Sequence, residues 1–91
     1  MNVRGDSTTT LNSLLAVGES VGITLFVPNG LTAYYLSGII VDGGAGTRTI
    51  QYQNANPIAA GNSSCTDVYV VYLIKTAANT WSVYVSQTKY A

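Results

Sequence analysis

Short runs of residues in which β-branched or aromatic side chains alternate with polar ones recur along this chain and dominate its pattern. In the clearest run, residues 80–90, Trp81, Val83 and Val85 are apolar, and the residues between them are mostly polar. A period of two places alternate side chains on opposite faces of a sheet. The run therefore predicts a strand with one buried face and one solvated face.

Turn-forming Gly, Asn, Pro and Asp separate this run from others like it. Strands are expected over residues 20–27, 31–35, 37–42, 47–53, 67–75 and 80–90. The Pro28-Asn29-Gly30 turn is expected to return the chain antiparallel to the strand at 20–27. Within that strand, Phe26 falls on the polar side. Residues 54–66 have little periodicity and are expected to form a loop.

Residues 67–75 differ from the other runs because both of their faces are apolar. Val68, Val70 and Tyr72 fall on one face, and Tyr69 and Val71 fall on the other. Parallel or sandwiched strands that are buried on both sides have this composition. The run predicts a central strand covered on both sides.

The beginning of the chain supports two interpretations. Leu11, Leu14 and Leu15 have helical spacing, whereas the run of threonines at 8–10 favours a strand. We expect residues 1–17 to form an extended arm that can join the sheet as an edge strand, and residues 18–91 to form one β-sandwich domain. The predicted class is all-β, an antiparallel β-sandwich or jelly-roll-like barrel of about six to seven strands.

Charge is scarce in this chain. Charged residues make up 9% of its 91 residues, and the formal net charge is +0. About 25% is usual, and a net charge near zero favours association. We therefore expect much of the surface to face other protein and the chain to form a homo-oligomer.

The same inventory excludes several classes of function. The chain has no histidine, and its few carboxylates are far apart in sequence, so we expect no catalytic residues, no metal site and no cofactor. The four basic residues are scattered, which argues against nucleic-acid binding. A single cysteine, Cys65, cannot form a disulfide within the chain. No run is apolar enough to cross a membrane or to serve as a signal peptide, so we expect no membrane insertion.

Tyrosines are the best candidates for contacts. The candidate interface or glycan contacts are Tyr34, Tyr35, Tyr52, Tyr69, Tyr84 and Tyr90. Tyrosine covers large areas of a sheet face or a subunit interface at low entropic cost, and its ring can also stack on a sugar. We favour core or interface contacts over glycan stacking, and both interpretations stay open.

Several segments carry a family resemblance. They are Phe26-Val27-Pro28-Asn29-Gly30-Leu31-Thr32-Ala33-Tyr34-Tyr35, Ile40-Val41-Asp42-Gly43, Asp67-Val68-Tyr69, Leu73-Ile74-Lys75-Thr76 and Val85-Ser86-Gln87-Thr88-Lys89-Tyr90-Ala91. Together they resemble the C-terminal β-rich module of tail-fibre-like and other virion structural proteins of marine tailed phages, cyanophages included. The resemblance covers about residues 18–91. One departure is Tyr52-Gln53-Asn54-Ala55, where the family tends to have Trp-Gln-Gly-Gly.

The resemblance implies a non-enzymatic structural protein located in the virion. In the family the module ends a longer fibre-like chain, whereas this copy follows a Met and a short leading segment. A small capsid decoration protein or a fibre end is therefore expected, with other capsid or tail proteins as partners. The alternative is a receptor-binding module that recognises host surface glycans.

Overall fold

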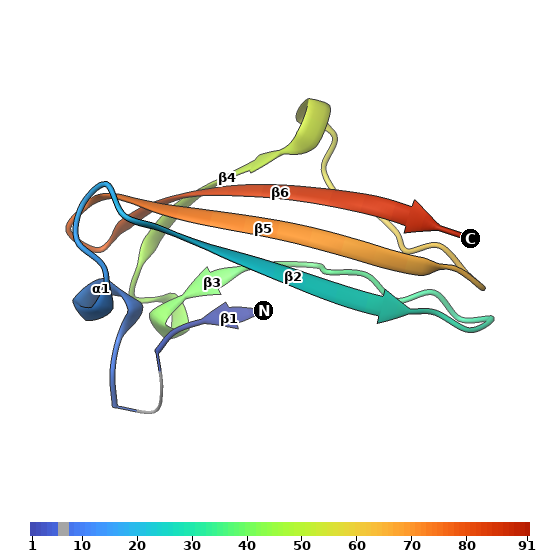
Figure 1. Ribbon diagram of the computed structural model, residues 1–91, viewed down its shortest axis with the longest axis horizontal. Helices are drawn as coiled ribbons and strands as arrows, with labels where there is room; N and C mark the ends of the chain where they lie inside the picture. Colours follow the sequence, from blue (N-terminus) through green and yellow to red (C-terminus); the bar gives the residue numbers. More distant parts are fainter. Residues whose placement is uncertain (6–7) are drawn as a thin grey trace.

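A four-stranded sheet forms the body of the computed structural model, which describes residues 1–5 and 8–91 (Figure 1). Its strands are, in spatial order, β2 (Ser20–Pro28), β5 (Thr66–Ala77), β6 (Thr80–Tyr90) and β4 (Thr47–Tyr52). β5 pairs antiparallel with β2 and with β6. β4 pairs parallel with β6. The predicted strands at 20–27, 47–53, 67–75 and 80–90 are thus confirmed, with small changes at their ends.

Short elements complete the fold around this sheet. β1 (Asn2–Val3) and β3 (Ile40–Val41) form a parallel pair, and α1 (Leu11–Leu14) is one turn of helix. Two 3-10 turns, η1 (Asp42–Gly44) and η2 (Gln53–Ala55), precede and follow β4. The residues between η2 and β5 form the predicted loop.

The all-β, sandwich-like class is confirmed, and the sheet is mixed rather than purely antiparallel. The strands do not close into a barrel. The parallel pair within this sheet is β4 with β6. The hairpin between β5 and β6 makes these two strands antiparallel neighbours, and β6 separates β5 from β4. Because β4 runs in the direction opposite to β5, it runs in the same direction as β6.

The predicted hairpin at Pro28-Asn29-Gly30 is wrong. Residues 31–35 form no strand, and β2 pairs along its whole length with β5 instead. The Asn29 side chain turns the segment: its Oδ1 accepts a hydrogen bond of 3.0 Å from the backbone N–H of Tyr34. The predicted strand at 37–42 shrinks to β3, because only its last apolar residues find a partner, in β1.

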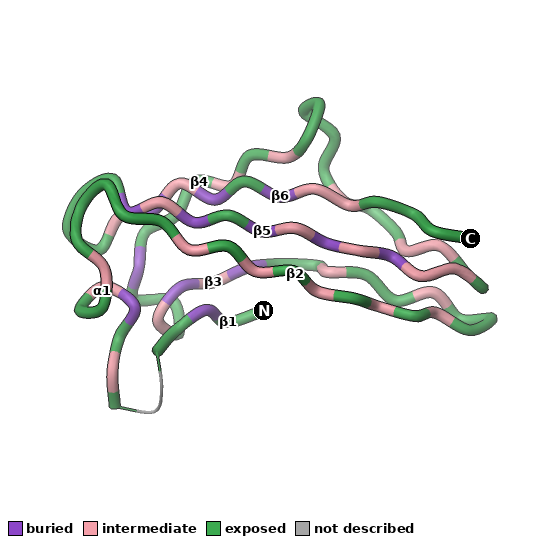
Figure 2. Tube along the Cα trace, in the orientation of Figure 1, coloured by how far each residue is buried: buried purple, intermediate pink, exposed green. Residues whose placement is uncertain are grey.

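The core lies on one face of the four-stranded sheet, which we call the inner face (Figure 2). Strands β5 and β6 supply alternate residues to it, and β1, α1 and β3 supply the cover. Its buried members are Val3, Leu11, Ile39, Val41, Val71, Leu73, Trp81, Val83 and Val85. The apolar face predicted for residues 80–90 is therefore the inner face of β6.

Two charged side chains fasten the N-terminal segment to this core. The Asp42 carboxylate accepts hydrogen bonds from the N–H groups of Leu11 (2.6 Å) and Asn12 (3.1 Å), at the start of α1. At the end of α1, Lys75 Nζ donates hydrogen bonds to the carbonyls of Asn12 (2.7 Å) and Leu15 (2.8 Å). An extended arm is expected over residues 1–17; within this range the structure has β1 and α1, which pack against the domain's own core through Val3 and Leu11.

Candidate interaction surface

The face of the four-stranded sheet opposite the core is open, and we call it the outer face. The strand registers define the residues that share it. They are Ser20, Gly22, Thr24, Phe26 and Pro28 of β2, Thr66, Val68, Val70, Tyr72 and Ile74 of β5, Thr80, Ser82, Tyr84, Ser86, Thr88 and Tyr90 of β6, and Thr47, Thr49 and Gln51 of β4. None of them is charged. The charge deficit of the sequence is therefore concentrated on one surface.

The charged residues that the structure describes all lie off the outer face, and several are used inside the molecule. Asp67 and Lys75 are buried on the inner face of β5. Glu19 Oε1 accepts a hydrogen bond of 2.6 Å from the N–H of Ala16 in the turn before β2. Arg48 and Lys89 are exposed at positions that alternate with those of the outer face.

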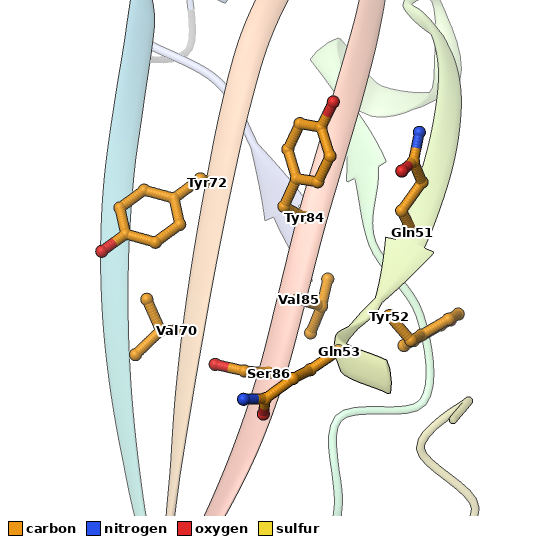
Figure 3. A pocket seen from close by; sticks show the side chains of 8 residues that line it. All are labelled: Gln51, Tyr52, Gln53, Val70, Tyr72, Tyr84, Val85 and Ser86. Carbon is orange, nitrogen blue, oxygen red and sulfur yellow. The ribbon is translucent and has the colours of Figure 1, made fainter. Parts of the chain in front are cut away.

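Two tyrosines form the centre of the outer face. Tyr72 of β5 and Tyr84 of β6 lie directly opposite each other, and their side chains are 57% and 45% exposed. Gln51 lies beside Tyr84 on β4. The Tyr72 ring extends over β2 at Gly22, where an added Cβ would come within 3.1 Å of the ring (Figure 3). A glycine at this position lets the ring lie against the backbone.

A shallow hollow of about 240 Å³ lies beside these two rings (Figure 3). It is lined by Gln51, Tyr52, Gln53, Val70, Tyr72, Tyr84, Val85 and Ser86. Pockets that enclose small-molecule ligands usually measure roughly 300–1,000 Å³, so this hollow is small for such a role. Its lining offers apolar area, amides and hydroxyl groups but no carboxylate, ammonium or thiol group.

Aliphatic side chains surround the tyrosine pair. Val68, Val70 and Ile74 are only half-buried, and Phe26 is 66% exposed. The prediction that β5 is covered on both sides is therefore wrong for this chain: β5 is central, but its own chain covers only the inner face. The composition of the strand indicates two apolar faces, and a single domain of this size has enough additional chain to cover one.

The six candidate tyrosines fall into four environments. Tyr84 and Tyr90 lie on the outer face. Tyr34 and Tyr35 are exposed in the loop after β2, while Tyr52 is half-buried against the core and also lines the hollow. The structure does not bring all six together.

Tyr69 belongs to the interior. Its side chain is 0% exposed, and its hydroxyl accepts a hydrogen bond of 3.1 Å from Gln87 Nε2. It is therefore corrected from a candidate contact to a core residue. Sequence reasoning omitted Tyr72, which is more exposed than Tyr84. The alternation along 67–75 separates Tyr72 from Tyr69, but nothing in the sequence indicates which of the two faces stays open.

The buried carboxylate of Asp67 organises the far end of the sheet. It accepts hydrogen bonds from Asn62 N–H (2.9 Å), Asn62 Nδ2 (2.6 Å) and Asn29 Nδ2 (3.0 Å). These bonds join the loop after β2 to the loop before β5. Because the carboxylate is 0% exposed and well partnered, it is a structural group and not a binding site.

Neither a metal site nor a spanning helix is found in the described part of the chain. Within residues 1–5 and 8–91, no three His, Cys, Asp or Glu side chains gather closely enough to hold a metal ion. Over the same residues, no helix has the length and apolar character needed to cross a bilayer. Comparisons of the chain with protein-family models, with curated proteins and with solved structures found no match.

Proposed function

We propose that this chain is a non-enzymatic structural protein of a tailed-phage virion, a small capsid decoration protein or fibre end that docks through its outer face. The observation that carries the docking role is the outer face itself, which is uncharged, half apolar and left open by its own chain. The resemblance of residues 18–91 to virion structural modules is the basis for the virion part of the proposal.

The size of the outer face is compatible with docking. Strands lie about 4.8 Å apart, and residues along a strand about 3.3 Å apart. A face of four strands, each taken at the nine residues of β2, therefore measures about 30 by 19 Å, or roughly 570 Å². Two such surfaces together bury about 1,100 Å², just above the roughly 1,000 Å² expected of a biological interface. Contact over this area needs no ion pair, because apolar burial contributes about 25 cal/mol per Å² before the costs of association.

Mass spectrometry of purified virions tests the virion assignment. Virions from the phage that encodes the chain should contain it in many copies per particle. Its absence from purified virions, when it is present in the infected-cell lysate, would overturn the proposal.

A docking experiment tests the role of the outer face. Purified chain should bind particles that lack it, and Ser86→Lys, which places a charge beside Val70 on the outer face, should abolish binding. Ser63→Lys is the matched control, because Ser63 is exposed in the loop before β5 and is not part of the outer face. Equal binding by both variants would contradict docking through the outer face.

A second candidate function is recognition of host surface glycans. The lining of the hollow favours it, because Tyr72 and Tyr84 offer ring faces for stacking and Gln51 and Gln53 offer amides to sugar hydroxyls. This candidate keeps Tyr52 and Tyr84 among the expected contacts, adds Tyr72, and leaves out Tyr34 and Tyr35 of the loop after β2.

Host-cell adsorption of the purified chain separates the two functions. Glycan recognition predicts that Tyr72→Ala and Tyr84→Ala each reduce adsorption while Tyr34→Ala leaves it unchanged. Structural docking predicts that the chain does not adsorb to host cells at all.

A further inference from the structure

The outer edge of β2 is an unused row of backbone hydrogen-bonding groups. β2 pairs only with β5, through Val21, Ile23, Leu25 and Val27, and alternate residues direct their N–H and C=O groups to the other side. These residues are Ser20, Gly22, Thr24, Phe26 and Pro28, of which Pro28 offers only its carbonyl. Within residues 1–5 and 8–91, no strand pairs with this side of β2.

Nothing in β2 protects this edge from pairing. Proteins guard exposed edges with charged side chains, bulges, proline or very short strands. β2 has nine residues, an unbroken register with β5 and no charge, and its proline is its last residue. The opposite edge strand, β4, has six residues and carries the exposed Arg48. The two edges of the sheet are therefore unequal, and β2 is the open one.

We propose that a second copy of this chain pairs with this edge, β2 against β2, antiparallel about a two-fold axis at Thr24. Thr24 is the midpoint of the strand, so this register pairs the largest number of residues. Gly22 then lies opposite Phe26 of the partner subunit, and Ser20 lies opposite Pro28 of the partner subunit. The missing N–H of proline falls at the end of the ladder, where it removes only a terminal bond.

The side chains at this register complement one another. Phe26 is 66% exposed, and the Tyr72 ring lies against the backbone at Gly22, where an added Cβ would come within 3.1 Å of it. In the pair, the ring of Phe26 of the partner subunit comes opposite Gly22 and packs against the Tyr72 ring that lies over this glycine. Aromatic residues opposite glycine stabilise strand pairs in this way.

Pairing of this kind joins two sheets into one of eight strands and makes their outer faces continuous. The biological purpose of this pairing rests on the proposed function, because the pairing doubles the uncharged area available for docking. The pairing is measured with purified chain alone, so its failure leaves the particle-binding result to stand or fall separately.

Sedimentation of charge variants tests which surface pairs. Wild-type chain should show a concentration-dependent dimer, and Thr24→Lys, which sets two ammonium groups across the two-fold axis, should weaken it by about fivefold or more. Thr49→Lys is the matched control on the same face at the other edge, and it should leave the dimer unchanged. A wild-type monomer at millimolar concentration would overturn the proposal, and so would equal loss in both variants, which would indicate face-to-face packing.

Disulfide trapping tests the register. Directly opposed, hydrogen-bonded residues have Cα atoms about 5.5 Å apart, within the range that a disulfide spans. In a Cys65→Ser background, Thr24→Cys should therefore form a covalent dimer under mild oxidation, and Thr49→Cys should not. Circular dichroism checks that each variant is folded. Equal cross-linking of the two variants would contradict pairing through β2.

Discussion

The two faces of β5 have similar apolar side chains but different surroundings. On the inner face, Tyr69, Val71 and Leu73 are fully buried beneath the N-terminal segment and the loops. On the outer face, Val70 is half-buried and Tyr72 is 57% exposed. The inner face of β5 also holds two charged residues, Asp67 and Lys75, whereas the outer face of β5 has none.

This difference shows how the chain uses its few charges. Asp67 and Lys75 lie near the two ends of the inner face, and both are satisfied by loop or helix groups. Buried charges are tolerated only with such partners. The inner face is thus specified by the chain itself, while the outer face is free to contact another protein.

Truncation of neighbouring residues on β5 should separate the two faces most strongly. Leu73→Ala should lower the free energy of unfolding by about 3 kcal/mol, because it leaves a cavity in the core. Tyr72→Ala, one residue away on the outer face, should lower it by about 1 kcal/mol or less. Urea denaturation of both variants provides the comparison. Similar losses would mean that the outer face is packed in the isolated chain.

Removal of the buried carboxylate should have the next largest effect. Asp67→Ala leaves the donors of Asn29 and Asn62 without an acceptor and should lower the free energy of unfolding by about 2–3 kcal/mol. Asp67→Asn keeps one carbonyl oxygen and should lose less, as measured by the same denaturation. A loss under about 0.5 kcal/mol for Asp67→Ala would show that this carboxylate does not hold the two loops.

Loss of the buried ammonium should have a smaller and more local effect. Lys75→Met keeps the apolar stem and removes the donor to the carbonyls of Asn12 and Leu15, at a cost of about 1–2 kcal/mol. Amide hydrogen exchange should accelerate in α1 and at Leu15 directly after it, whose N–H bonds to the carbonyl of Leu11. Lys89→Met, at an exposed position, is the control and should change neither quantity. Unchanged exchange in α1 would refute the role given to Lys75.

A charge on the outer face should affect stability least and association most. Ser86→Lys should change the free energy of unfolding by no more than about 0.5 kcal/mol, because the ammonium can reach water. The same variant should lose binding to particles in a pull-down. A large loss of stability without loss of binding would reverse the assignment of the two faces.

Sequence periodicity was sufficient to locate the long strands but not their neighbours. The runs at 20–27 and 80–90 became β2 and β6 nearly to the residue because their alternation is strong. Alternation shows which residues share a face of a strand, but it does not show which other strand pairs with it. The sequence therefore could not show that β2 pairs with β5 rather than with residues 31–35.

The candidate surface was only partly predictable for the same reason. Charge scarcity predicts an interface, which stays a prediction, and the alternation along 80–90 correctly predicts that Tyr84 lies on the exposed side of its strand. Tyr69 and Tyr72 occupy equivalent apolar positions on opposite faces of β5, and only the path of the covering segments decides which one is buried. The Tyr72–Tyr84 pair depends on the register of β5 and β6, which sequence alone does not provide.

Hydroxyl-radical footprinting of tyrosines, in the free chain and in intact virions, tests the central claim that the outer face is the docking surface. In the free chain, Tyr72 and Tyr84 should be labelled readily, while the buried Tyr69 should be labelled slowly. In virions, labelling of Tyr72 and Tyr84 should fall several-fold. Unchanged labelling of these two residues in assembled particles would contradict the claim.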